Sequence, residues 1–350
     1  MPSKSKKIEE VSFFKEHEFL LSLLSFLVIL ILIIIFFRAP STSGKFQTCG
    51  DGTFYGSCSL VKPYYCDNGS LYEKASLCGC TDNRTSDSCI TSFQIRPKNF
   101  NLSYVLNGQK KEIGFTVYSG LSDYLSGLSR AIFYDSGEKP VRSDFTLKKI
   151  NEQEQRKLLL PLVIEIQNLT KDKQEQARIA ISIVQNIPYG ASNKTNNFLG
   201  LSLNYSRYPY EVLSDGQGIC GEKSELLAFL LRDLGYGVVI FYNQKENHAS
   251  VGIKCPVKES YKGTGYCFVE TTGPAIISDN SIIYVGGITL QSDPEIIFIS
   301  SGNSLGSNLP EYIDAQTMQN IRRGKIVLFR DSRLQNLRQK YGLVEAYNIG

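Results

Sequence analysis

The sequence predicts an α+β fold in which a helix that begins at a cysteine packs on an antiparallel sheet. A single transmembrane helix and a small Cys-rich module precede this core. Three observations predict it. An apolar run occupies residues 19–37, six cysteines follow between residues 49 and 89, and a leucine-rich helical pattern after Cys220 is followed by short strand-like segments.

The apolar run predicts a membrane anchor. Residues 19–37 contain only two polar side chains, Ser22 and Ser25, and are long enough to span a bilayer as a helix. No small-residue cleavage site follows, which favours an uncleaved anchor over a signal peptide. Lysines concentrate before the run, at Lys4, Lys6, Lys7 and Lys15. We therefore expect a single-pass cell-membrane protein with a cytoplasmic tail, 1–18, and with the chain beyond the anchor outside the cytoplasm.

The segment 38–90 is predicted to be a small module held together by disulfides. It is rich in Gly, Ser, Asp and Asn, and its even number of cysteines suits three bridges, with fifteen pairings open: Cys49, Cys58, Cys66, Cys78, Cys80 and Cys89. A thiolate zinc site is the alternative, although the single residue between Cys78 and Cys80 is shorter than usual zinc-ligand spacing. Glycosylation sequons beyond the anchor agree weakly with an extracellular glycoprotein: Asn68, Asn83, Asn101, Asn168, Asn193 and Asn204.

The segments that flank the leucine-rich helical pattern after Cys220 predict its surroundings. Asn107-Gly108 between two strand-like runs predicts a hairpin, placed in a β-rich subdomain, 91–150. Two amphipathic helices, 151–170 and 171–187, open a catalytic domain spanning 151–300, which ends with strand-like runs at 282–285 and 295–299. The C-terminal extension, 301–350, is polar, with a basic helix near 333–341 and no readable function.

Cys220 is predicted to lie at the N-terminus of a helix. Glycines surround it at positions 216, 218 and 221, and apolar residues then recur with helical spacing up to Gly235. The macrodipole and free N–H groups at a helix N-terminus favour a thiolate. The same N–H groups stabilise an oxyanion on an attacked carbonyl group.

His248 and Glu270 complete a candidate catalytic triad. The chain has two histidines, and His17 precedes the apolar run, so His248 is the only imidazole base available to Cys220. Residues 247–253 and 266–272 read as strands, and antiparallel pairing could bring Glu270 beside His248. Cysteine, histidine and carboxylate are a nucleophile, its base and the group that orients the base. Singly, the three residues also suit a buried thiol or half of a disulfide, a core histidine and a surface glutamate.

Five ordered motifs support this assignment: Ile183-Val-Gln-Asn-Ile-Pro-Tyr189, Arg207-Tyr-Pro-Tyr-Glu211, Gly218-Ile-Cys220-Gly-Glu-Lys-Ser224, Asn247-His248-Ala-Ser-Val-Gly252 and Val269-Glu270-Thr-Thr272. Through them, residues from about 175 to 275 resemble the transglutaminase-like superfamily of papain-related cysteine enzymes, especially its prokaryotic and archaeal membrane-anchored members. The resemblance implies a papain-like fold with Cys220 as nucleophile, His248 as base and Glu270 as third member.

Three departures from that superfamily stand out. The third member is often Asp rather than Glu, and the position of Ile219 is often acidic. Relatives often carry a side-chain oxyanion donor, frequently Trp, some 35 residues before the cysteine, but this chain has no Trp. The resemblance implies Gln185 as the substitute donor, and a helix-surface glutamine is the alternative.

Cysteine parity raises a further pairing. Cys255 and Cys267 could form a bridge, which would leave Cys220 as a free thiol. If Glu270 lies opposite His248, however, Cys267 lies four residues away from the position facing Cys255. Four strand residues span roughly 13 Å, beyond the roughly 7 Å limit between disulfide Cα atoms. The pairing therefore stays open.

The function predicted is a membrane-anchored, cell-surface thiol enzyme that cleaves or transfers peptide or amide acyl groups. Its substrate is a protein or peptide, its membrane contact is 19–37, and neither cofactor nor metal is expected. The alternatives are a protein-crosslinking transglutaminase and a noncatalytic surface adhesion or scaffold protein. No phosphate loop or basic–aromatic pattern indicates nucleic acid, and a net charge of +4 selects no partner.

Overall fold

The computed structural model describes residues 22–30, 47–80, 82–135, 137–198, 201–282 and 289–343. The chain divides into two compact units, residues 1–47 and residues 48–350. In the first unit, residues 22–30 are helical, and the remainder of the predicted span 19–37 lies outside the described residues. No helix in the described ranges is both long and apolar enough to cross a membrane. The anchor therefore stays a prediction.

The Cys-rich module opens the second unit. Strands β1 (Ser57–Cys58), β2 (Tyr64–Asp67) and β3 (Ser70–Glu73) form an antiparallel sheet, followed by helix α2 (Ala75–Cys78) and the hairpin β4 (Asn83–Thr85) and β5 (Ser88–Ile90). Three disulfides link Cys49 to Cys66, Cys58 to Cys78, and Cys80 to Cys89. The predicted disulfide framework is thus confirmed in preference to a zinc site.

Asn168 connects this module to the helical part of the unit. Its side-chain amide donates to the carbonyl of Leu71 at 2.9 Å and its carbonyl oxygen accepts the Leu71 N–H at 2.7 Å. A glycan on Asn168 would crowd this pairing, because it would replace one hydrogen of the amide nitrogen that donates to Leu71. The Asn168 side chain is therefore already engaged in hydrogen bonds, whereas four other sequon asparagines are exposed: Asn68, Asn83, Asn101 and Asn193.

The predicted hairpin is present as β6 (Pro97–Leu106) and β7 (Gln109–Tyr118), paired from Pro97–Tyr118 to Leu106–Gln109. Asn107 and Gly108 have φ angles of 52° and 76°, as a two-residue turn of type I′ requires. Helices α3 (Ser119–Gly127) and α4 (Arg142–Ile150) follow. The hairpin packs against the later helix Lys173–Asn186.

The two predicted amphipathic helices are α5 (Gln153–Leu169) and α6 (Lys173–Asn186). Each begins after a carboxylate that accepts two backbone N–H groups, Glu152 for α5 and Asp172 for α6. The hairpin β8 (Thr195–Phe198) and β9 (Leu201–Asn204), helix α7 (Pro209–Asp215) and helix α8 (Cys220–Asp233) follow. The leucines of α8 are fully buried between α6, α7 and a β-sheet.

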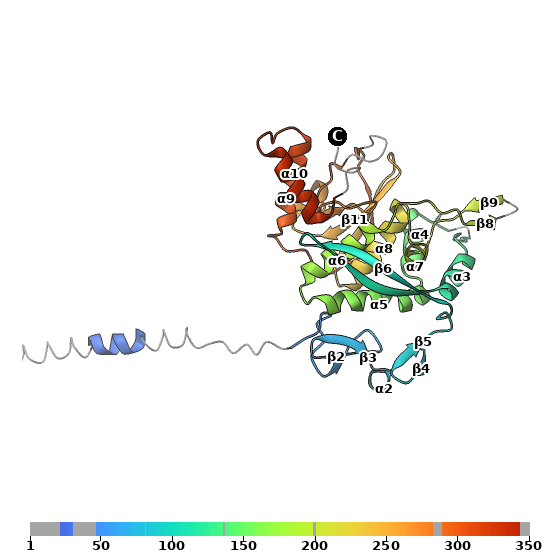
Figure 1. The fold of residues 1–350 in the computed structure, drawn as a ribbon, viewed down its shortest axis with the longest axis horizontal. Coiled ribbons are helices and arrows are strands. Elements are labelled where there is room, and N and C mark those ends of the chain that lie inside the picture. The colour runs from blue at the N-terminus through green and yellow to red at the C-terminus, as the bar shows by residue number, and fades with distance from the viewer. Residues whose placement is uncertain are drawn as a thin grey trace, which may run out of the picture. The chain divides into compact units, whose positions relative to one another are not determined.

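That sheet is antiparallel, with the described strands in the order β12-β11-β10-β13. Their bounds are β10 (Val238–Asn243), β11 (His248–Lys254), β12 (Tyr266–Val269) and β13 (Glu295–Ser300), and two short 3₁₀ segments, η1 (Val257–Glu259) and η2 (Tyr261–Gly263), join β11 to β12. Helix α8 contacts β10 and β11 (Figure 1). The predicted mixed α+β fold, with the cysteine helix packed on an antiparallel sheet, is present.

The sheet is covered on both faces, which the alternating sequence of β11 did not indicate. Val238, Val251 and Ile253 join the core under α8. On the other face, Phe241, Tyr261 and Phe268 form a separate cluster. A Cβ atom on Gly252 would lie 2.7 Å from the Phe241 ring, so this position requires glycine. Both sides of β11 are therefore inside the protein.

The C-terminal extension contains two helices, α9 (Pro310–Arg322) and α10 (Arg330–Tyr341), which appear in red in Figure 1. The predicted basic helix near 333–341 is thus present, with an earlier start. The two helices share a small core: Ile276, Ala315, Met318, Ile321, Leu337 and Leu343. The predicted strand at 282–285 is not described as such, because residues 283–288 lie outside the described ranges.

Candidate active site

Cys220 is the first residue of α8, and an arginine–carboxylate pair fixes the turn that leads to it. Glu222 accepts the Ile219 N–H at 3.0 Å and so caps the helix. The same carboxylate accepts the Arg207 N–H at 2.7 Å and its guanidinium at 3.0 Å. Arg207 also pairs with Asp215, at the end of α7, at 2.8 Å. Two helix ends are thus bound to one fully buried arginine.

The sulfur of Cys220 is free and partly exposed. All nine cysteines lie in the described ranges, and the other eight form disulfides. Its Sγ atom lies 4.0 Å from the carbonyl oxygen of Asn247, directly before His248. The N–H groups of the first helical turn have no acceptor inside the helix. A reacting carbonyl at this sulfur would therefore meet unpaired donors.

His248 lies between the thiol and a buried carboxylate. Its Nε2 atom is 2.9 Å from Oε2 of Glu270, which is fully buried. The other carboxylate oxygen, Oε1, accepts the N–H of Thr272 at 2.8 Å and its hydroxyl at 2.6 Å. Glu270 is therefore held at both oxygens, and Nδ1 is the ring nitrogen left for Cys220. The structure brings the three predicted triad residues together.

The environment of His248 favours its charged form. Burial alone would lower the pKa of this imidazole, but the Glu270 charge, with hydrogen bonds to Cys220 and Glu270, raises it to about 10. The ring therefore carries protons on both nitrogens at neutral pH. A cationic imidazole beside a thiol stabilises the thiolate and can later give a proton to a leaving amine.

The register of β11 and β12 differs by two residues from one that would set Glu270 directly opposite His248. Val251 pairs with Val269, and Ile253 pairs with Cys267. Glu270 consequently lies diagonal to His248 instead of opposite it, just past the end of β12. Glu270 and His248 are beside each other without direct opposition, because residues 255–265 turn through two 3₁₀ segments that set the offset. A diagonal neighbour remains within reach of a long side chain.

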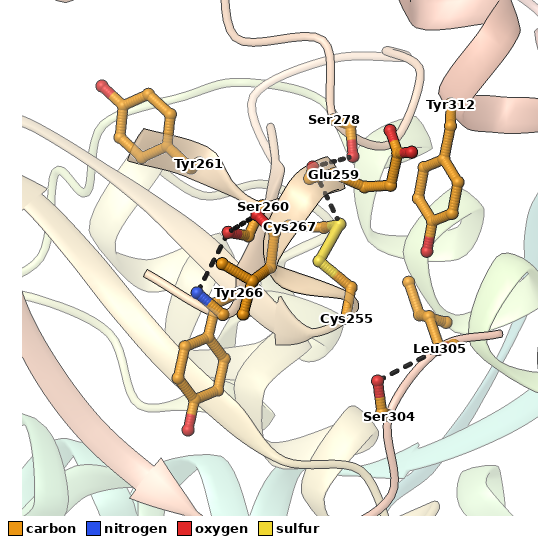
Figure 2. Close-up of a disulfide and its surroundings, with 12 residues drawn as sticks. Cys255, Glu259, Ser260, Tyr261, Tyr266, Cys267, Ser278, Ser304, Leu305 and Tyr312 are labelled. Carbon is orange, nitrogen blue, oxygen red and sulfur yellow. Dashed lines mark hydrogen bonds between the residues drawn. A yellow bond between two sulfur atoms is a disulfide. The ribbon is translucent and has the colours of Figure 1, made fainter. Parts of the chain in front are cut away.

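The same register permits the disulfide that was left open. Cys255 and Cys267 are bridged with their Cα atoms 5.7 Å apart, as Figure 2 shows. The Cys255 N–H donates to Gly265 at 3.0 Å, so Cys267 is again a diagonal neighbour. The Sγ atom of Cys267 also lies 3.3 Å from the carbonyl oxygen of Glu259. The bridge closes the turn that leads toward Glu270.

Gln185 has a different role from the predicted oxyanion donor. Its amide nitrogen donates both hydrogens to backbone carbonyls, of Glu270 at 2.9 Å and of Ala275 at 3.1 Å. Neither N–H remains for a reacting carbonyl. The residue is also buried, so the helix-surface alternative is equally incorrect. Gln185 instead holds the backbone of the triad glutamate.

Lys223 is a buried residue beside the site that the sequence reasoning missed. It is fully buried, and its ammonium donates to the carbonyls of Ile187 at 2.5 Å, Thr272 at 3.2 Å and Gln185 at 3.4 Å. Burial lowers the pKa of Lys223 to about 8, against the raising effect of the Glu270 charge. A signal was present: Lys223 precedes Leu226, Leu227 and Leu230 on the apolar face of α8.

A cavity of about 510 Å³ opens beside Cys220. Its wall is mainly apolar: Phe145, Ile219, Ile240, Tyr242, Ala249 and Ile297. The charged groups in it are paired. Arg142 lies 3.5 Å above the Tyr242 ring and 3.7 Å from Glu295. Lys149 lies 2.6 Å from Glu225.

The lysine–glutamate pair lies at the buried side of this cavity. Burial raises the pKa of Glu225 to about 7, although the Lys149 charge opposes the shift. Because each charge faces a partner of opposite sign, the cavity presents little net charge to a ligand. A neutral, apolar side chain is the group that it fits best.

Comparisons with known proteins add little to this geometry. No family model and no curated protein matches the chain. Among solved structures, it is similar to Legionella pneumophila LapG, with 18% identity, 38% of this chain and 75% of that chain covered, and a TM-score of 0.23. A calcium-bound form of that protein gives 13% identity, 51% and 99% coverage, and a TM-score of 0.24. Superpositions this limited carry no functional argument, so function is inferred from the side chains.

Proposed function

We propose that this protein is a thiol enzyme that cleaves peptide or amide bonds through Cys220, His248 and Glu270. The observation that carries the proposal is the placement of the one free thiol at the N-terminus of α8, beside an imidazole that a fully buried carboxylate orients. A merely structural thiol needs neither partner. A free thiol among eight bridged cysteines also needs a reason to persist.

The reaction follows from the positions of the protons. The Cys220 sulfur attacks the substrate carbonyl, and the carbonyl oxygen gains negative charge next to the free N–H groups of the first turn of α8. His248 gives a proton to the leaving amine as the carbon–nitrogen bond breaks. Water then loses a proton to His248 and attacks the thioester, which releases the acid and restores the thiol. Glu270 keeps the ring oriented and stabilises its positive charge throughout.

The cavity indicates the substrate. Its apolar wall and internally paired charges fit a substrate residue with a large uncharged side chain next to the scissile bond. A peptide supplies such a side chain together with the amide that the triad needs. The proposed activity is therefore that of a cysteine peptidase or amidase on protein substrates.

The proposed location is the outer side of a membrane. The four disulfides support an oxidising compartment, and the apolar run 19–37 supports a single-pass anchor. Protease added to intact cells should digest the part of the chain after residue 47. Protection of that part until the cells are lysed would place it inside and overturn this orientation.

Covalent labelling tests the proposed activity. A peptidyl acyloxymethyl ketone with a Leu side chain at the acyl position should label the wild-type protein, and Cys220→Ala should abolish labelling. His248→Gln should slow labelling at least tenfold, whereas Lys110→Gln, on the exposed hairpin, is the matched control and should label normally. Equal labelling of wild type and Cys220→Ala would refute the nucleophile.

The fate of the acyl group separates hydrolysis from crosslinking. Incubation with a glutamine-containing peptide and a labelled primary amine should give cleavage or deamidation without stable incorporation of the amine. Dominant incorporation of the amine would assign the site to a transglutaminase instead. Absence of both products, together with absence of labelling, would favour the noncatalytic scaffold.

A further inference from the structure

An exposed apolar segment joins α9 to α10. We define the α9–α10 tip as residues 323–333. In it, Val327, Leu328 and Phe329 are 79%, 78% and 75% exposed. Figure 1 shows the two helices and their connection in red at the periphery of the second unit. Single exposed apolar side chains are ordinary, but three consecutive ones indicate a contact surface.

Val327, Leu328 and Phe329 have no role in the core that the two helices share. That core uses Met318 and Ile321 of α9 and Leu337 of α10, with Ile326 as the last partly buried contact before the three exposed residues. The next three side chains point away from it. Their apolar character is therefore not explained by the fold.

Exposed basic residues flank the apolar segment on both sides: Arg323, Lys325, Arg330 and Arg333. The tip contains one acid, Asp331. None of the four basic residues forms an ion pair with any group in the described ranges, whereas the neighbouring Arg322 binds Asp279 at 2.6 Å. The positive charge of the tip is thus available to an external partner.

We propose that the α9–α10 tip binds an anionic lipid surface. Val327, Leu328 and Phe329 enter the boundary between headgroups and acyl chains, and the flanking arginines and lysine contact lipid phosphates. A protein partner fits less well, because a stable interface buries roughly 800 Å² on each side and the tip offers three apolar side chains. A lipid surface needs only a few apolar side chains with a basic rim. The proposal does not depend on catalysis at Cys220.

Vesicle binding tests the proposal on the second unit alone. Residues 48–350 form a compact unit with its own core and disulfides, so a fragment that begins at Thr48 is suitable and lacks the apolar run 19–37. The fragment should co-sediment with vesicles of phosphatidylglycerol and phosphatidylcholine. It should bind pure phosphatidylcholine vesicles at least tenfold more weakly, and high salt should weaken its binding to the anionic vesicles.

Two variants and one control locate the contact. Replacement of Val327, Leu328 and Phe329 by Ser should weaken binding at least tenfold, and Arg330→Gln with Arg333→Gln should weaken it and reduce its salt dependence. Phe133→Ser changes an apolar residue that is 85% exposed outside the tip and should bind as wild type. Unchanged melting curves confirm that the variants fold.

Three results would overturn the proposal: no binding to anionic vesicles, equal binding of the serine variant, or an equal loss with Phe133→Ser. Analytical ultracentrifugation adds a fourth. A dimer that the serine variant abolishes, without any vesicle binding, would assign the tip to self-association instead.

Discussion

Nε2 of His248 and Oε2 of Glu270 lie 2.9 Å apart although the two residues are diagonal neighbours across β11 and β12. The diagonal explains why a glutamate occupies this position. A diagonal contact is longer than a direct cross-strand contact, and the additional methylene of Glu covers the difference. An aspartate would hold its carboxylate short of the ring.

We therefore expect Glu270→Asp to impair catalysis although the charge is retained. Labelling by the peptidyl acyloxymethyl ketone should slow by roughly tenfold or more, the usual scale for a misplaced acid–base partner. Glu270→Gln keeps the length and loses the charge, and it should slow labelling as well. If the Asp variant reacts at the wild-type rate, the side-chain length is not what the diagonal requires.

The free energy of unfolding should depend on pH through His248. Burial lowers and the Glu270 and Cys220 contacts raise the pKa of this imidazole, from 6.5 to about 10. The folded state thus holds the proton more tightly than the unfolded chain. The stabilisation is complete below about pH 6.5 and is lost as the pH rises through about 10.

Chemical denaturation of wild type and His248→Gln should reveal this contribution. The difference between their free energies of unfolding should shrink from about pH 6 to about pH 10. Lys223 and the other titrating groups remain in both proteins, so the difference reports the imidazole together with its coupling to Glu270 and Cys220. If the difference between the two free energies of unfolding stays constant across this interval, the folded structure does not change the pKa of His248.

Lys223→Met should destabilise the protein and weaken catalysis together. The substitution leaves the carbonyls of Ile187 and Thr272 without their buried donor, and each such loss costs about 1–3 kcal/mol. Thr272 in turn holds Glu270, so labelling should slow even at temperatures where the variant is folded. Lys258→Met, at an exposed position, is the control. A stable variant with normal labelling would remove Lys223 from the positioning of the triad.

Phe145→Ala should weaken the preference of the site for bulky acyl side chains. Phe145 lines the cavity and is partly exposed, so the fold should tolerate the change. The preference for a Leu probe over a Gly probe, measured as the ratio of labelling rates, should fall by roughly tenfold. Phe133→Ala lies outside the cavity lining and should keep the wild-type ratio. An unchanged ratio in Phe145→Ala would place the acyl side chain elsewhere.

Removal of the Cys255–Cys267 bridge should loosen the strand that precedes Glu270. The bridge closes a short loop, and its loss from Cys255→Ser with Cys267→Ser should cost about 3 kcal/mol. Heating should reduce the rate of Cys220 labelling more in this variant than in the wild type, because β12 ends directly before Glu270. Thermal unfolding and labelling rates measured together check both parts. If the variant and the wild type unfold at the same temperature, the strand pairing alone fixes the turn.

Much of the site could be predicted from sequence because its signals are local. Glycines before an apolar helical repeat place Cys220 at a helix N-terminus, and the scarcity of histidine selects His248. The hairpin at Asn107-Gly108 follows from the φ angles that its turn demands. The cysteine count predicted bridges in the Cys-rich module, although the pairings themselves came only from the fold.

Other features could not be predicted because they depend on contacts between distant segments. Gln185 was assigned to an oxyanion by its distance along the chain from Cys220, but the backbone of the Glu270 segment takes both its N–H groups. Lys223 resembles an ordinary surface lysine until α6 and the segment after β12 surround its ammonium with carbonyls. No local sequence pattern predicts which distant segments lie beside Gln185 and Lys223 in the folded chain.

The sequence by itself determined which residue types meet at the site: a cysteine at a helix N-terminus, one usable imidazole and a carboxylate that follows them. The tertiary structure decided how they meet. The observed pairing of β11 and β12 is shifted by two residues from a register with Glu270 directly opposite His248. This shift places Glu270 beside His248 along one diagonal and Cys267 beside Cys255 along the other. Register depends on the turn and the packing of both faces of the sheet, which are properties of the folded chain rather than of any one segment.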